Sequence, residues 1–517
     1  MPITPGRISE SLARLSAGWP PTSCPPLDEF LAVWKDEVAP TSIQGREKDV
    51  IYFQTALPKS RLRGSHAVPC MALGGTSAEM TAKVHEFVQI RSGPGRIVFL
   101  FCLSGAAEAA ANSAVRSERC VIWSPQRIEQ AWTSGHLLET CCETVRERVP
   151  VRMLMPYDIT ISAKGSMFYG RESELGKLLQ EDTQSFAITG PGRIGKTSLV
   201  NRLEEELVAR GDPERVAVFS VDFFECADKS DNAVARKIAM AIEPGRRADR
   251  TTANDLAGFI EYQRHRLGRK PTLIFDEVDE LCAGTLFKEQ ITVPARHDDA
   301  RFILVGKSGL LHFTKDNSRA LSSRLRVIKL GEIDAEPARK LLYEPIRDLG
   351  LDFENFELIF DLVERHTGRS PHMIQFYGQR LVELAAEQGE RRVLIRHVDQ
   401  LKWDHQTACF FLSPLDDLKH QPVAHVLALA LLKSDPGPIT PITIQDLGRL
   451  HGFTIPHSEA IEIGDVLVIQ NILLWADGGG YRIANQALPE YAGKMGYLTR
   501  GLEEAKQRAH TLRPRAS

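Results

Sequence analysis

Residues 190–197 limit the fold of this chain more narrowly than any other stretch. They read Gly-Pro-Gly-Arg-Ile-Gly-Lys-Thr and fit the pattern G-x-x-x-x-G-K-[S/T]. A short apolar run, residues 185–189, precedes them. The residues that follow carry apolar side chains at helical spacing, namely Leu199, Val200, Leu203 and Leu207. The pattern therefore predicts a buried strand, a tight loop and a helix, in that order.

The chemistry of this loop favours phosphate binding. Glycines let the backbone curl so that successive N–H groups converge on an anion, and the helix N-terminus adds partial positive charge. We expect Lys196 to reach the β- and γ-phosphates of ATP or ADP, and Thr197 to offer its hydroxyl to Mg²⁺. The expected nucleotide-binding residues of the loop are Gly190, Pro191, Gly192, Arg193, Ile194, Gly195, Lys196, Thr197 and Ser198.

A second part of the expected site is an apolar run that ends in acidic residues. Residues 273–275 (Leu-Ile-Phe) lead directly into Asp276 and Glu277. We expect Asp276 to hold Mg²⁺, directly or through water, and Glu277 to polarise the attacking water as a catalytic base. Asp279 and Glu280 extend the acidic run, and we interpret them as solvated or capping groups.

Two further strands fit the same sheet. One is predicted before Asp222, and another ends at Lys307 and Ser308, where a polar side chain could contact the γ-phosphate. With these strands, the chain is predicted to contain an α/β P-loop NTPase core with a parallel sheet.

Length and pattern divide the 517 residues into several parts, since domains average roughly 150 residues. A separate α/β domain is expected to precede the NTPase core. The predicted divisions are an irregular segment (1–45), an N-terminal α/β sensor or effector domain (46–160), the NTPase core (161–335), a helical lid (336–415), a winged helix (416–499) and a loose basic tail (500–517).

Composition excludes several classes of protein. The formal net charge of −3 gives no argument for a polyanionic partner, and the nine cysteines contain no Cys-x-x-Cys pair that would suggest zinc. The longest apolar runs, 97–103 and 426–432, are far shorter than the roughly 20 residues that span a bilayer. We therefore predict a cytoplasmic protein with reduced thiols and no membrane contact.

The N-terminal domain alternates short apolar strands with helices. Strands are predicted at 49–53, 68–73, 97–103 and 120–123, and helices at 78–90, 106–115 and 125–134. The back half resembles the strand-helix-strand-helix order of restriction-endonuclease-like domains. A nuclease would need several metal-binding carboxylates, and the region offers only Asp49 and Lys59. We prefer a non-catalytic sensor or adaptor and keep an ATP-gated nuclease as an alternative.

Three further segments resemble the STAND NTPases and their archaeal ATPase and origin-recognition relatives within the AAA+ group. Residues 168–175 (FYGRESEL) are similar to the family's F-x-GRE-x-EL, residues 321–333 (LSSRLRVIKLGEI) to its L-x-x-R segment, and residues 367–371 (TGRSP) to its TGGHP. The resemblance covers about residues 165–495. It implies a nucleotide-binding domain, a helical lid and a winged helix that together act as a signalling switch.

The resemblance also implies roles for individual residues. Arg171 and Pro371 would contact the nucleotide, and Arg324 would face the γ-phosphate within the chain or across a subunit interface. The chain departs from the family at two places. Arg369 replaces the second glycine of the lid motif, and Lys307 with Ser308 replaces a Thr-Ser-Arg type of strand end.

The predicted winged helix is poorly equipped to read DNA. Its third helix carries Glu459, Glu462 and Asp465 and no lysine or arginine, and residues 416–517 have a net charge of −1. Packing within the chain or against a protein partner is favoured. The functional hypothesis is a slowly hydrolysing Mg·ATP switch that assembles with itself or with a protein partner. A DNA-binding regulator or initiator with the same core remains an alternative.

Overall fold

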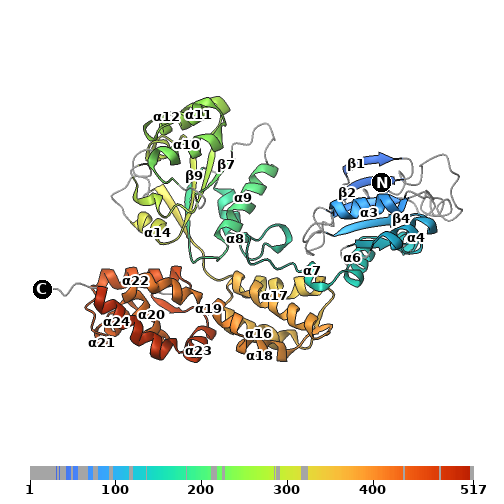
Figure 1. Cartoon of the computed structure of the whole chain (residues 1–517). Helices are drawn as coiled ribbons and strands as arrows, with labels where there is room; N and C mark the ends of the chain where they lie inside the picture. Colours follow the sequence, from blue (N-terminus) through green and yellow to red (C-terminus); the bar gives the residue numbers. More distant parts are fainter. Residues whose placement is uncertain are drawn as a thin grey trace. The chain divides into compact units, whose positions relative to one another are not determined.

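The computed structural model is shown in Figure 1. It describes residues 31, 34, 42–47, 50–55, 68–73, 80–91, 97–115, 120–134, 137–181, 183–210, 218–223, 228–284, 286, 291–315, 324–434, 437–476 and 479–512. The chain forms two compact units. The first contains residues 1–158, 342–354 and 378–397, and the second contains residues 159–341, 355–377 and 398–517.

The first unit is built on a mixed sheet in the order β1-β2-β3-β4-β5. Neighbours among the first three strands are antiparallel, whereas β4 and β5 continue the sheet in parallel with β3. The strands are β1 (Ser42–Glu47), β2 (Val50–Thr55), β3 (Val68–Leu73), β4 (Val98–Cys102) and β5 (Cys120–Trp123).

The helices of this unit pack their apolar faces against the sheet. Met71 and Leu100 share one buried cluster with Val84 and Phe87 of the first helix and Ala107 of the second. A second set of buried side chains consists of aromatic rings, namely Trp34, Phe53, Phe99, Phe101 and Trp123. The helices are α3 (Met80–Arg91), α4 (Gly105–Ala114), α5 (Pro125–Ser134), α6 (Leu137–Arg148) and α7 (Val151–Leu154).

The strands and helices predicted for the N-terminal domain are present within two residues of their expected bounds, and the structure adds β1, α6 and α7, which were not predicted. The edge strand β1 begins at Ser42, inside the segment predicted to be irregular up to residue 45. Its sequence, SIQGRE, lacks regular alternation of apolar and polar residues, and its pairing with β2 shifts register between Ile43 and Gly45. Because a bulged edge strand has little apolar periodicity, the sequence pattern did not predict it. Asp49 and Lys59 lie outside the described residues.

Two later segments of the chain complete the first unit. The Tyr157 hydroxyl donates a hydrogen bond to the Leu342 carbonyl over 3.0 Å. A Cβ at Gly378 would lie 2.4 Å from the Tyr157 ring, so a glycine is required where this ring packs. Two short strands, β11 (Asp352–Phe353) and β12 (Arg392–Val393), pair in parallel.

The second unit contains a five-stranded parallel sheet in the order β10-β6-β9-β8-β7. The chain order therefore reverses around β6, and β9 lies between β6 and β8. In open parallel sheets ligands bind at the carboxyl ends of the strands beside such a reversal. The strands are β6 (Ser185–Thr189), β7 (Val218–Asp222), β8 (Thr272–Asp276), β9 (Arg301–Gly306) and β10 (Leu325–Lys329).

Alternating side chains of these strands enter two apolar clusters. Ile188 and Ile274 pack in a cluster with Leu178 and Leu203, while Phe275 packs in a separate cluster with residues of later helices. The alternation explains why each strand is a nearly continuous apolar run. The helices around the sheet are α8 (Glu172–Gln180), α9 (Lys196–Arg210), α10 (Asp231–Ile242), α11 (Arg246–Asp249), α12 (Leu256–Leu267), α13 (Thr292–Arg296) and α14 (Ser308–Lys315).

The chain after β10 is mainly helical. Helices α15 (Ala335–Asp348) and α17 (Pro371–Glu387) each contribute residues to both units. The other helices of the segment predicted to be a lid are α16 (Phe356–Thr367), α18 (Ile395–Trp403) and α19 (His405–Asp417). The short helical turns are η1 (Gly165–Met167), η3 (Ala253–Asp255), η4 (Leu281–Ala283), η7 (Leu418–His420) and the π-helical η8 (Tyr497–Gly501).

Three helices and a hairpin follow in the order of a winged helix. They are α20 (Pro422–Ser434), α21 (Pro441–Leu450), α22 (His457–Ile469), β13 (Leu473–Trp475) and β14 (Tyr481–Ile483), and α23 (Ala487–Lys494) comes next. Thr440 caps α21 through its side chain, and Pro441 occupies the first helical position. Across the ranges that the structure describes, no helix is both long and apolar enough to cross a bilayer.

The C-terminal segment is ordered as a helix, which corrects the prediction of a loose tail from residue 500. Helix α24 (Leu502–Leu512) packs along α20 and buries Leu502, Ala505 and Ala509. Its charged residues obscured the apolar stripe, which occupies one position in every three or four.

Replacing Leu502 with alanine tests this helix. Leu502 is 3% exposed, so its truncation should lower the local free energy of unfolding of α24 by about 2–5 kcal/mol. Amide hydrogen exchange across α20 and α24 measures that change. Arg500→Ala is the control, because its side chain is 88% exposed and its ion pair with Glu504 contributes little. Equal exchange in both variants would contradict the packing.

Candidate functional site

The loop between β6 and α9 is shaped by positions that only certain residues tolerate. A Cβ at Gly190 would lie 2.4 Å from the Leu330 carbonyl oxygen, and Gly195 has a φ of +101°. Both positions therefore need glycine. Arg193 also has a positive φ, +60°, which is unfavourable for a side chain of its size. The backbone thus has the tight curve that the motif predicts.

Lys196, the first residue of α9, points back over this loop. Its Nζ donates hydrogen bonds to the carbonyls of Gly190 (2.9 Å) and Pro191 (2.7 Å), and the residue is 6% exposed. Burial, with a smaller contribution from the nearby Lys307, lowers the pKa of Lys196 to about 8. A phosphate would be a stronger partner for this ammonium than the two carbonyls.

Thr197 and Asp276 meet although they belong to different elements. The Thr197 hydroxyl donates to Oδ2 of Asp276 over 2.7 Å, and Oδ1 of the same carboxylate accepts the backbone N–H of Glu277 over 2.9 Å. Burial raises the pKa of Asp276. A hydroxyl beside a carboxylate is a donor set suited to Mg²⁺, which takes one or two protein oxygens and completes its shell with phosphates and water. The predicted metal ligands are therefore adjacent, and they fit Mg²⁺.

Glu277 follows the end of β8 with a φ of +54°. Its Oε2 lies 3.3 Å from Nζ of Lys307, which follows the end of β9. Because β9 lies between β6 and β8, the three strand ends place the phosphate loop, Lys307 and Glu277 along one edge. Two polar strand-end residues predicted from the sequence are thus in direct contact.

The sequence predicted that Asp279 is either a solvated group or a helix cap, and the structure shows a cap. Its carboxylate accepts the Lys307 N–H at 2.7 and 2.8 Å and the Leu310 N–H at 3.2 Å. It therefore caps the first turn of α14, which begins at Ser308. Glu280 is more exposed and forms an ion pair with Lys229.

Two other residues that were predicted to bind the nucleotide, Arg171 and Ser198, form hydrogen bonds that hold the loop and α9 in place. Arg171 is 4% exposed, and its guanidinium donates to the carbonyls of Ile194 (3.2 Å) and Gly331. Ser198 accepts the backbone N–H of Ala163 over 3.0 Å. These contacts anchor the loop and its helix to neighbouring segments of the same unit.

The lid motif lies beside the loop. Gly368 and Arg369 have φ values of +56° and +60°, so the family's second glycine corresponds here to an arginine in the left-handed region. Pro371 occupies the first position of α17, and the next residue, His372, contacts the phosphate loop: its Nε2 is 3.2 Å from Nη1 of Arg193. His372 was not predicted, and only its place beside Pro371 could have suggested it.

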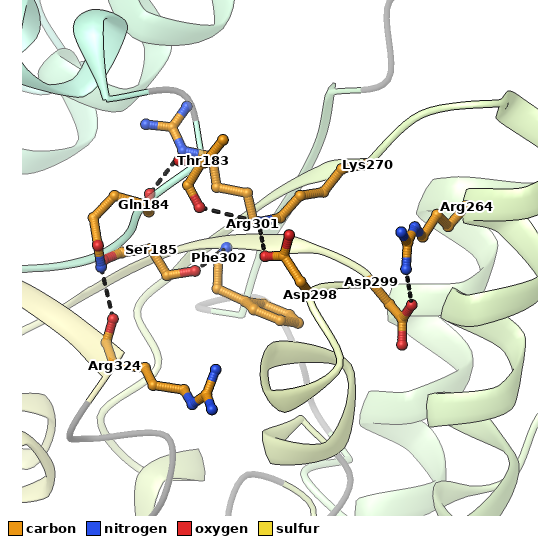
Figure 2. Close-up of polar contacts among 10 residues, drawn as sticks. All are labelled: Thr183, Gln184, Ser185, Arg264, Lys270, Asp298, Asp299, Arg301, Phe302 and Arg324. Carbon is orange, nitrogen blue, oxygen red and sulfur yellow. Dashed lines mark hydrogen bonds and ion pairs between the residues drawn. The ribbon is translucent and has the colours of Figure 1, made fainter.

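Arg324 lies away from the loop. It directly precedes β10, and its carbonyl accepts a hydrogen bond from Gln184 over 2.7 Å, as Figure 2 shows. β10 pairs with β6 in parallel from Leu325 opposite Ser185, so Arg324 lies at the amino end of the strands. The phosphate loop follows their carboxyl end, about 13 Å away along a five-residue strand. The prediction that Arg324 faces a γ-phosphate bound to the same chain is therefore wrong.

The surroundings of Arg324 serve the fold. Arg301 is buried and donates to the carbonyls of Gln184 (2.9 Å) and Leu178, while Lys270 pairs with Asp298 (Figure 2).

Within the described ranges no group of three or more His, Cys, Asp or Glu residues could hold a metal ion by itself. A metal at the phosphate loop would thus depend on Thr197, Asp276 and the phosphates.

Replacing Gly190 with alanine tests the shape of the loop. The added Cβ would collide with the Leu330 carbonyl, which cannot move without shifting β10, so Mg·ATP affinity should fall by about tenfold or more. Titration with a fluorescent ATP analogue measures this. Gly176→Ala in α8, where a Cβ meets open space, is the matched control and should bind as the wild type does. Normal binding by Gly190→Ala would show that the loop has a different shape.

Comparisons with known proteins agree with this geometry in the centre of the chain. Residues 179–313 match the family described as AAA domain. No curated protein matches the chain. Among solved structures, a Walker-type ATPase of Pyrococcus abyssi is similar, with 19% identity over 65% of this chain and 98% of that chain and a TM-score of 0.48.

Two further solved structures are similar to the chain. The ORC2 protein of Aeropyrum pernix has 13% identity over 66% of this chain and 95% of that one, with a TM-score of 0.45. The ORC1 protein of the same organism, solved in complex with DNA, has 18% identity over 67% and 95%, with a TM-score of 0.37. The family match and the parallel sheet, with its phosphate loop and acidic strand end, establish that the chain carries an AAA-type P-loop ATPase domain.

Proposed function

We propose that this protein is a cytoplasmic ATP-driven switch of the STAND type, which hydrolyses Mg·ATP slowly and controls assembly with itself or with a protein partner in signalling. ATP and ADP would occupy the loop at 190–198. Lys196 would neutralise the phosphates, Thr197 and Asp276 would hold Mg²⁺, and Glu277 would polarise the attacking water.

The contact between the phosphate loop and the winged helix carries this proposal. The backbone N–H of Gly192 donates to the carbonyl of Ile469, the last residue of α22, over 3.1 Å. A change in loop geometry would therefore act directly on the helix end.

Complementary side chains support the same interface. Lys315 of α14 forms an ion pair with Asp465 of α22, and Arg482 of β14 forms one with Glu332, which follows β10. Lys329 of β10 lies 5.0 Å from the centre of the Trp475 ring. Asp465, one of the three acidic residues of the third helix, is thus engaged within the chain, which favours intramolecular packing over DNA reading.

Arg324 keeps one proposed role. Since it lies at the amino end of β10, it could reach a γ-phosphate only in a second copy of the chain. Self-assembly would therefore bring the Arg324 of one chain to the nucleotide bound by another, where its charge would stabilise the transition state.

Replacing Glu277 with glutamine tests the switch. The neutral amide can position water but cannot accept its proton, so turnover should fall about a hundredfold or more while ATP is retained. Measurements are the nucleotide that co-purifies, steady-state ATPase rates and the particle mass in ATP. Glu280→Gln is the control, because its partner is the exposed Lys229. A Glu277→Gln protein that turns ATP over normally would contradict the assignment, and a wild type that binds no nucleotide would refute the proposed function.

A charge swap tests the interface. Lys315→Asp would face Asp465 with a like charge, so the winged helix should release from the core and nucleotide exchange should accelerate about threefold or more. The double variant Lys315→Asp/Asp465→Lys restores opposite charges and should return exchange toward the wild-type rate. Stopped-flow release of a fluorescent ADP analogue measures both. Equal rates in the wild type and the single variant would separate this interface from nucleotide control.

A further inference from the structure

Two adjacent residues at the tip of the phosphate loop are held by different parts of the second unit. Gly192 bonds to the end of α22, and the Arg193 side chain contacts His372 in the first turn of α17. The second contact is the more specific, because it joins a loop residue in an unfavourable backbone conformation to a side chain that no motif assigns. Position 193 is one of the variable positions of the loop motif G-x-x-x-x-G-K-[S/T]. Its φ of +60° is a backbone conformation that favours glycine.

The chemistry of the contact defines what His372 does. A guanidinium can only donate, so Nε2 of His372 must accept, and the imidazole must be neutral. Burial and the neighbouring Arg193 lower the pKa of His372 to about 4, which keeps the ring neutral near pH 7.

The ring of His372 is itself held in place. Its centre lies 5.2 Å from that of Phe410, and the Phe410 ring stacks on Phe376 at 3.9 Å with an interplanar angle of 5°. Phe376 belongs to the same helix as His372, and Phe410 belongs to α19. The acceptor nitrogen is therefore presented by packed lid helices rather than by a freely rotating side chain.

We propose that His372 is a positioning residue for nucleotide binding: by accepting a hydrogen bond from Arg193 it holds that residue in its left-handed conformation and maintains the curve of the phosphate loop. The inference rests on the nucleotide binding of the proposed function and adds a regulatory element to it. Any movement of the first turn of α17 would remove the acceptor and weaken nucleotide binding, so the lid controls affinity through one hydrogen bond.

The test measures Mg·ATP affinity by titration with a fluorescent analogue, together with kcat at saturating ATP. His372→Ala should weaken binding by about three- to tenfold, since a hydrogen bond from a charged donor is lost, and should change kcat by less than about twofold. His372→Gln supplies a neutral side-chain oxygen as acceptor and should recover most of the affinity. Thermal melting of each variant checks that the lid remains folded.

A double-mutant cycle separates positioning from general packing. Glycine adopts a positive φ without a restraint, so adding His372→Ala to Arg193→Gly should cause no further loss of affinity. An equal loss in both backgrounds would show that His372 acts through the lid alone and would overturn the proposal, as would wild-type affinity in His372→Ala. Failure of the wild type to bind nucleotide would instead refute the proposed function on which the inference rests.

Discussion

The hydrogen bond between Thr197 and Asp276 connects the start of α9, which follows β6, to the end of β8, a strand that is not a neighbour of β6. β6 and β8 are separated by β9, so their loops can meet only because all three strands are parallel and end at one edge. The same arrangement brings Lys307, at the end of the intervening strand, to Glu277. Asp279 then caps α14 and fixes the strand end that carries Lys307. Each of these contacts would be lost if the sheet order were different.

The phosphate loop is also connected to segments far along the chain. Arg171 donates a hydrogen bond to a carbonyl of the loop, and His372 of α17 contacts Arg193 of the loop. Ile469, at the end of α22, accepts a hydrogen bond from Gly192 of the loop. The loop is thus a junction as well as a binding site.

Sequence reasoning predicted the parts that a local sequence pattern specifies. The strands of the parallel sheet are continuous apolar runs, and the loop motif has fixed spacing, so both were predicted close to their observed bounds. Features that depend on tertiary contact were not predicted. The edge strand β1 has no alternation, and the apolar stripe of α24 is interrupted by charges. Arg324 was assigned by resemblance, and only the strand register shows at which end of the sheet it lies.

The burial of Lys196 couples two equilibria. Its pKa is lowered to about 8, so between pH 8 and its ordinary value the side chain in the folded protein is largely uncharged. A polyphosphate beside it would favour the charged form again, and nucleotide binding in that range would therefore take up a proton. By linkage the reverse also holds, because protonating Lys196 strengthens the attraction for phosphate. Nucleotide binding and protonation of Lys196 would therefore favour each other, and the affinity for nucleotide would fall as the pH rises above about 8.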